Sequence, residues 1–156
     1  MRHPSLVPLS HDHHHGLALA LRCRKQALGQ IKPMGTVGLK ERAHEARLFF
    51  ANHLVDHFRA EEDVLFPTLG SLVAASAPII DQLLQEHEQI RCLALQLETE
   101  PGLGKRLFDF GDLLEGHIRK EERELFPLFE QHVGAKDAEI AAEQIRKILG
   151  TDARGS

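Results

Sequence analysis

Apolar residues recur three and four positions apart along nearly the whole chain, and no stretch alternates as a β-strand would. This period predicts five helices, over about residues 10–31, 37–69, 76–99, 105–133 and 136–149. Ser10 or Asp12 is the expected N-cap of the first helix. Turn-forming residues separate the helices, most clearly Lys32-Pro33-Met34-Gly35 and Glu100-Pro101-Gly102-Leu103-Gly104.

The connections between the first four predicted helices are short, which favours an all-α, up-down-up-down four-helix bundle. The fifth helix is shorter and would be an addition to that bundle. A chain of 156 residues is long enough to bury one core. We therefore expect residues 1–150 to form a single domain and residues 151–156 to form a flexible tail.

The second and fourth predicted helices carry the same motif. His57-Phe-Arg-Ala-Glu61-Glu62-Asp-Val-Leu-Phe-Pro67 recurs as His117-Ile-Arg-Lys-Glu121-Glu122-Arg-Glu-Leu-Phe-Pro127. In each copy a histidine and a glutamate lie four residues apart, so they share one face of a helix, one turn apart. Each proline is expected to bend or end its helix. The second glutamate of each copy, Glu62 or Glu122, is expected to face outward in a solvated or supporting role.

The phase of the helices places several polar side chains in the interior. His57, Glu61, His117 and Glu121 lie on the apolar stripes of their helices, and so does His87 in the third helix. Glutamate is almost never fully buried unless it is paired or coordinates a metal. No lysine or arginine lies on these stripes, so a multivalent metal ion would supply the missing positive charge.

The first helix begins with the cluster His11-Asp12-His13-His14-His15. His14 is followed by apolar residues at helical spacing and is expected to face the interior, with His13 as the alternative. His53 lies one turn before His57 on the same face, where it could bind an ion or line a pocket beside one. The predicted metal-binding residues are therefore His14, His53, His57, Glu61, His87, His117 and Glu121.

Taken together, these motifs resemble the hemerythrin-like, or HHE cation-binding, domain family. The resemblance rests on the two histidine–glutamate motifs, on His87 and on the histidine-rich start of the first helix, and it covers about residues 9–133. Members of that family fold as a four-helix bundle around a non-haem di-iron centre. The resemblance implies that Glu61 and Glu121 bridge two iron ions, with the histidines as terminal ligands.

The chain departs from hemerythrins proper at two positions. Those proteins carry a second histidine in the third helix, where Leu83 stands here. Their bridging carboxylate in the fourth helix is an aspartate five residues after the histidine, whereas Glu121 follows His117 at four. Oxygen-carrier chemistry therefore does not transfer directly, and His53 is a candidate for the missing nitrogen.

The expected function is the binding of iron and of a small molecule such as dioxygen, nitric oxide or peroxide, in oxygen or redox sensing or in iron handling. A di-iron enzyme or stress-repair protein, which consumes peroxide or nitric oxide or donates iron to iron–sulfur clusters, is one alternative. A metal-free helical interaction domain is another, although its buried glutamates would have to protonate or hydrate. Zinc is a weaker choice of metal, because its sites favour four-coordinate histidine and cysteine sets.

Composition limits the partners and the location. A net charge of −4 argues against nucleic-acid binding, and the chain lacks an apolar run long enough for a membrane span. Cys23 and Cys92 have no zinc-binding spacing and are expected to be free thiols. The N-terminus has no signal-peptide pattern, so a cytoplasmic location is expected. A protein partner or a homodimer, formed for instance through the last helix, stays an open possibility.

Overall fold

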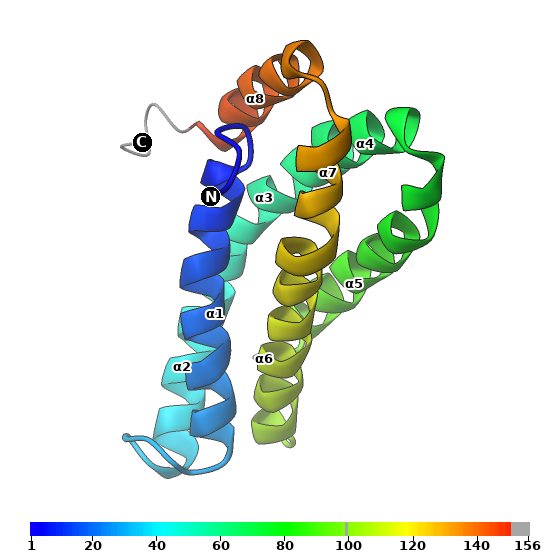
Figure 1. The fold of residues 1–156 in the computed structure, drawn as a ribbon. Helices are drawn as coiled ribbons and strands as arrows, with labels where there is room; N and C mark the ends of the chain where they lie inside the picture. The colour runs from blue at the N-terminus through cyan, green and yellow to red at the C-terminus, as the bar shows by residue number, and fades with distance from the viewer. Residues whose placement is uncertain (99, 151–156) are drawn as a thin grey trace.

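Helices make up almost all of the structure, a computed structural model that describes residues 1–98 and 100–150 (Figure 1). Those residues contain no β-strand. All five predicted helices are present, and the prediction of an all-α fold is confirmed. The predicted tail, residues 151–156, lies outside the described residues.

Four long helical stretches run alternately up and down, and a fifth lies across one end (Figure 1). The first is α1 (Val7–Ala27). The second comprises α2 (Gly35–Phe49), η1 (Phe50–Leu54), α3 (Val55–Ala60), η2 (Glu61–Leu65) and α4 (Phe66–Leu72). The third is α5 (Ala77–Leu95), which follows the 3-10 turn η3 (Ala74–Ser76). The fourth comprises α6 (Leu103–Lys120), η4 (Glu121–Leu125) and α7 (Phe126–His132), and α8 (Ala135–Leu149) is the fifth.

Three segments, η1, η2 and η4, are π-helical turns inside the long helices. In both copies of the repeat the π segment begins at the first glutamate. The amide of Phe66 donates to the carbonyl of Glu61, and that of Phe126 donates to the carbonyl of Glu121, five residues back. The helix then continues past each proline, which stands in the first turn of the next α segment, where helical geometry tolerates it. The repeat prolines therefore do not end their helices.

Two apolar clusters fill the bundle and enclose a polar layer between them. On α5, His87 stands between Leu83, which belongs to one cluster, and Ile90, which belongs to the other. The same order holds on the other three long helices. The C-terminal helix α8 packs against α3 and η2 and adds its apolar face to the first cluster. Buried apolar side chains therefore lie on both sides of the polar layer, and their burial stabilises the bundle around it.

Small residues of α1 face α6 at a close approach of the two helices. A Cβ atom on Gly16 would lie 2.8 Å from Cδ1 of Ile118, and one on Gly111 would lie 2.6 Å from the carbonyl oxygen of Ala20. Leu21 and Leu28, two of the larger residues at helical spacing from His14, are exposed, whereas Leu9 and Leu19 are buried. The prediction that the interior stripe of this helix includes His14, Leu21 and Leu28 is wrong. The N-cap is Leu6, so the predicted caps at positions 10 and 12 lie inside the helix.

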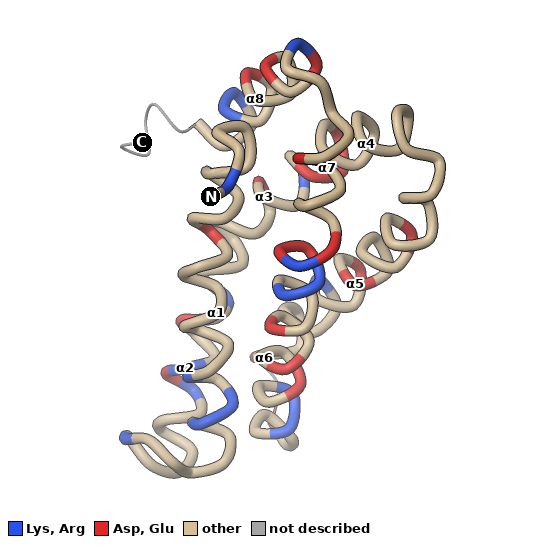
Figure 2. The backbone as a smooth tube through the Cα atoms, in the orientation of Figure 1, with Lys and Arg blue, Asp and Glu red and all other residues tan. Residues whose placement is uncertain are grey.

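The outer surface carries charges of both signs. Lysine and arginine alternate with aspartate and glutamate along α2, α6 and α8 (Figure 2). Among the described residues, no helix is both long and apolar enough to cross a membrane.

Candidate metal centre

Six buried side chains from the four long helices meet in the polar layer. They form two groups, which are His13, His57, Glu61 and Glu121, and Glu61, His87, His117 and Glu121. Within each group, one ligand atom per residue lies within 4.8 Å of all the others. Glu61 and Glu121 belong to both groups, so the two groups share their carboxylates.

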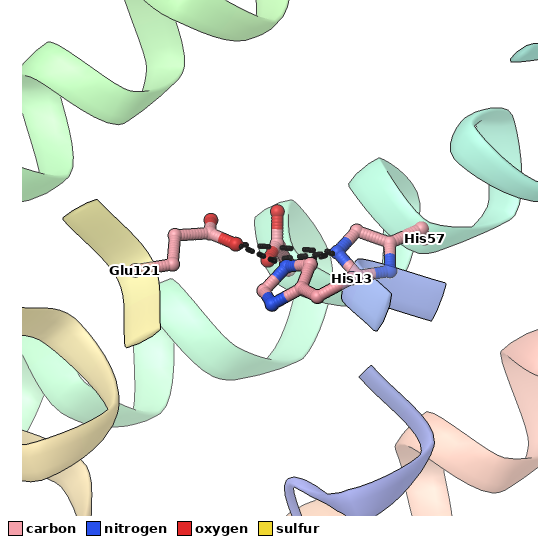
Figure 3. A group of neighbouring side chains, drawn as sticks. His13, His57 and Glu121 are labelled. Atoms are coloured by element: carbon pink, nitrogen blue, oxygen red, sulfur yellow. Dashed lines mark hydrogen bonds and ion pairs between the residues drawn. The ribbon is translucent and has the colours of Figure 1, made fainter. Parts of the chain in front are cut away.

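Each imidazole turns its Nε2 atom inward, toward a carboxylate. Figure 3 shows this for one group, where Glu121 and His57 point toward each other from different helices and His13 lies between them. The distances from Nε2 to the nearest carboxylate oxygen are 2.8 Å for His13 to Glu121, 3.1 Å for His57 to Glu61, 2.9 Å for His87 to Glu61 and 3.4 Å for His117 to Glu121.

Each imidazole also turns its Nδ1 atom outward, to a second carboxylate. The Nδ1 to oxygen distances are 2.6 Å for His13 to Glu122, 3.1 Å for His57 to Asp12, 2.6 Å for His87 to Glu62 and 2.8 Å for His117 to Glu86. A carboxylate on Nδ1 fixes the ring orientation and keeps the Nε2 lone pair directed at the centre. All four rings are therefore held ready to bind an ion through Nε2.

The four carboxylates that contact the Nδ1 atoms, called the outer carboxylates below, are related by an approximate internal two-fold symmetry that extends beyond the repeated motif. The dipeptides Asp12-His13 on α1 and Glu86-His87 on α5 play equivalent parts, because the acid of each pair holds a repeat histidine of another helix. Sequence reasoning did not assign Asp12 or Glu86 to the site. The shared acid-histidine dipeptide was the signal that could have identified them. Glu62 and Glu122 take the supporting role that was expected, although they are only partly exposed.

The buried histidines have raised pKa values, so their protonated imidazoles balance the negative charge of the buried carboxylates. Burial alone would lower the pKa of His117, but the charge of Glu121 and the hydrogen bonds of His117 with Glu121 and Glu86 raise it to about 9. The pKa of His57 likewise lies well above its usual value, despite burial, because of Glu61 and Asp12. Burial would raise the pKa of Glu121, but the neighbouring histidines hold it well below its usual range. Without a metal, protons on the imidazoles therefore supply the positive charge.

Some buried polar atoms of the centre lie at ion-pair distance from one another but make no hydrogen bond of good geometry. Within the described residues, Nε2 of His117 and both carboxylate oxygens of Glu121 are buried and make no hydrogen bond. A buried polar atom left without any hydrogen bond costs at most about 1–3 kcal/mol. Imidazole nitrogens and carboxylate oxygens are ligands that iron and similar transition metals accept, and an ion bound by these atoms would remove the cost. The residues present therefore fit a metal centre.

The family model described as Hemerythrin, hemerythrin HHE cation binding domain, matches residues 6–146. This chain belongs to the hemerythrin HHE cation-binding domain family. Searches of curated proteins and of solved structures find no match. The resemblance predicted from the repeat is thereby confirmed, and the match extends into α8, which the motifs had not covered.

Aromatic rings of this HHE domain pack against two of the imidazoles. His87 stacks on Phe58 with ring centroids 3.8 Å apart, and Phe66 stacks nearby at 5.6 Å. His13 stacks on Phe126 at 5.3 Å. Phe66 and Phe126 are the same position of the two Leu-Phe-Pro sequences, so the repeat supplies an apolar wall as well as polar groups.

Five of the seven predicted residues of the HHE domain come together, as the two groups above show, and two do not. His14 is exposed, and His13 takes the inner position of α1, so the prediction that His14 faces the interior is wrong. The reason is the small-residue contact with α6, which turns the face beginning at His13 inward. The His53 side chain is 44% exposed and lies outside both groups, with Nδ1 4.0 Å from Oδ1 of Asp12.

Proposed function

We propose that this HHE domain holds two iron ions, one in each group of ligands, with Glu61 and Glu121 as bridges. The observation that carries the proposal is the burial of these two glutamates, each 0% exposed, in both groups at once. Buried carboxylates require a compensating charge. Four inward Nε2 atoms and two shared carboxylates give each ion two nitrogens and a share of two carboxylates.

A small molecule completes this proposal. Four protein donors per ion are fewer than an octahedral iron accepts, so positions remain for dioxygen, nitric oxide or peroxide. Iron would supply the ability to bind such molecules and to exchange electrons with them. The apolar clusters on both sides exclude bulk water and larger ligands from the layer. The outer carboxylates keep the four imidazoles oriented while a ligand enters and leaves.

We infer a role in oxygen or redox sensing or in iron handling. Cys23 and Cys92 are free thiols, which supports a reducing compartment such as the cytoplasm. Binding without turnover is the behaviour expected here. Catalytic consumption of peroxide or nitric oxide would favour the enzyme alternative.

The decisive experiment measures iron per chain together with the visible spectrum, in air and after anaerobic reduction. The proposal expects two iron ions per chain and an absorption band that bleaches on reduction. The chain contains no tyrosine or tryptophan, so protein absorbance in the near ultraviolet is low. A folded chain that takes up no iron after reconstitution would contradict the proposal. A colourless chain that contains zinc would contradict the assignment of iron and would identify the centre as a zinc site.

A further inference from the structure

A groove of ≈ 800 Å³ runs between α1 and α2, outside the His13 and His57 group. The two helices lie side by side in Figure 1. Three imidazoles line the groove, those of His11 and His15 from α1 and that of His53 from η1. None of the three belongs to the buried groups. Histidines therefore gather on both walls of one accessible groove.

His11 and His15 are arranged as a chelating pair. They lie four residues apart on α1, and their ring centroids are 4.8 Å apart. Two histidines at this spacing on one helix face can bind a single transition-metal ion. His14 lies between them in sequence and is equally exposed, but it does not line the groove. The helical spacing thus separates a groove-facing pair from a neighbouring histidine outside the groove.

Acidic groups make the same groove attractive to a cation. Asp12 lines it, and the Oδ1 atom of Asp12 lies 4.0 Å from Nδ1 of His53 on the other wall. Glu45 lines it as well, together with Arg22, and these two side chains form an ion pair at 2.6 Å. Glu45 also pairs with Arg42, so it offsets the charge of Arg22 only in part, and Asp12 is the acidic group that lies beside the imidazoles.

We propose that His11 and His15 form a second metal site that faces solvent and takes a divalent transition-metal cation, and that His53 on the opposite wall joins the bound ion after a side-chain rotation, since the three imidazoles do not form a group of closely spaced ligand atoms in the structure. Imidazole ligands suit zinc, copper and nickel. The site differs from the buried centre in its ligands, since it has no bridging carboxylate and only neutral nitrogens. Its ion is therefore bound more weakly and exchanges readily with solvent.

Equilibrium dialysis of the untagged, iron-loaded protein against Ni²⁺ at neutral pH tests the site, with nickel and iron counted in the same sample. One nickel per chain is expected. Nickel binding should weaken about 100-fold in His11→Gln or in His15→Gln, because each change removes an intramolecular second ligand. His53→Gln should weaken it less. His14→Gln is the matched control, since it removes an exposed histidine of the same segment and should bind nickel as the wild type does.

Unchanged nickel binding in both His11→Gln and His15→Gln would overturn the proposal. An equal loss in His14→Gln would overturn it too, because the histidine run would then bind without the groove. Unchanged binding in His53→Gln would remove that residue from the site. If the chain takes up no iron, nickel could enter the empty buried centre. Dialysis is then repeated with the double variant Glu61→Gln/Glu121→Gln, which lacks the shared carboxylates of that centre. Nickel binding and iron binding can then succeed or fail separately.

Discussion

The candidate centre has two halves, one that contains His13 and His57 and one that contains His87 and His117. In both halves the imidazoles contact the shared carboxylates in the same way, and in both halves an arginine pairs with the outer glutamate that holds one of the two histidines. In one half Arg91 lies 2.8 Å from Glu62, which holds His87. In the other half Arg2 lies 3.1 Å from Glu122, which holds His13. An arginine therefore fixes an outer carboxylate on both sides, although Arg2 comes from the N-terminal segment and Arg91 from α5.

The halves differ at the second histidine. The carboxylate of Glu86, which holds His117, forms an ion pair with Lys120. The carboxylate of Asp12, which holds His57, instead lines the groove beside His53. The inner contacts are thus set by the repeated residues, whereas the outer support depends on residues that the repeat does not contain. We expect the ion between His13 and His57 to leave first when metal is removed.

Removal of a shared carboxylate should have the largest effect and should not distinguish the halves. Glu121→Gln is expected to reduce iron from two ions per chain to nearly none, because Glu121 belongs to both groups. Iron analysis and circular dichroism would check this, with Glu124→Gln, an exposed residue of the same π segment, as control. One iron retained in Glu121→Gln would show that this glutamate serves a single half.

The metal-free protein should lose stability as the pH rises. The pKa of His117 is raised from 6.5 to about 9 in the fold, so its contribution is complete below pH 6.5 and is lost as the pH rises through 9. This shift corresponds to an upper bound on the order of 3 kcal/mol. Glu121, with a lowered pKa, contributes above its usual value of 4.5 and loses that contribution at lower pH.

Thermal unfolding of both forms from pH 5 to pH 10 measures this effect. Iron-loaded protein should not show the alkaline loss, because its imidazoles are neutral and ligated, and it should release iron in acid as protons compete. A metal-free protein that is equally stable at pH 6 and pH 9 would contradict the assigned protonation.

Loss of an outer carboxylate should act on one half only. Asp12→Asn and Glu86→Gln are each expected to weaken one ion by about 10- to 100-fold, because the ring of His57 or His117 loses its orientation. Chelator-driven iron release, followed in the visible range, should show two phases in the wild type. Asp12→Asn should accelerate the faster phase and Glu86→Gln the slower one. Identical traces for the two variants would refute the assignment of one acid to each ion.

The ion pair of Lys120 should have the smallest effect. Lys120→Met is expected to accelerate the slower phase by at most about fivefold, since partly exposed ion pairs contribute roughly 0.2–1 kcal/mol. Lys105→Met is the matched control, because it breaks the exposed pair with Asp109 at the far end of α6. A change in the faster phase instead would place Lys120 in the wrong half.

The sequence predicted most of the fold and most of the centre. The five helices followed from apolar spacing, and the repeat identified His57, Glu61, His117 and Glu121 because these polar residues stand on apolar stripes. His87 was identified in the same way on α5. In each case large apolar neighbours defined the buried face.

The α1 ligand and the outer carboxylates were harder to predict. The buried face of α1 includes Gly16, Ala20 and Cys23, so the size of the apolar residues indicated the wrong side. Packing of α1 against α6, which no single helix reveals, decided between His13 and His14. The partners of Glu86 and Asp12 lie on other helices and depend on the assembled bundle in the same way.

The π segments determine which kinds of mutation the centre can accept. A π turn contains about one residue more than an α turn, which rotates everything beyond it by about 100° about the helix axis. Loss of one residue from Glu61–Leu65 or from Glu121–Leu125 would restore a regular pitch and turn the following phenylalanine away from its imidazole. Substitutions there change single contacts, whereas a one-residue deletion would put one end of the helix out of phase with the other. We therefore expect the length of these two segments to be under stricter constraint than the identity of their exposed residues.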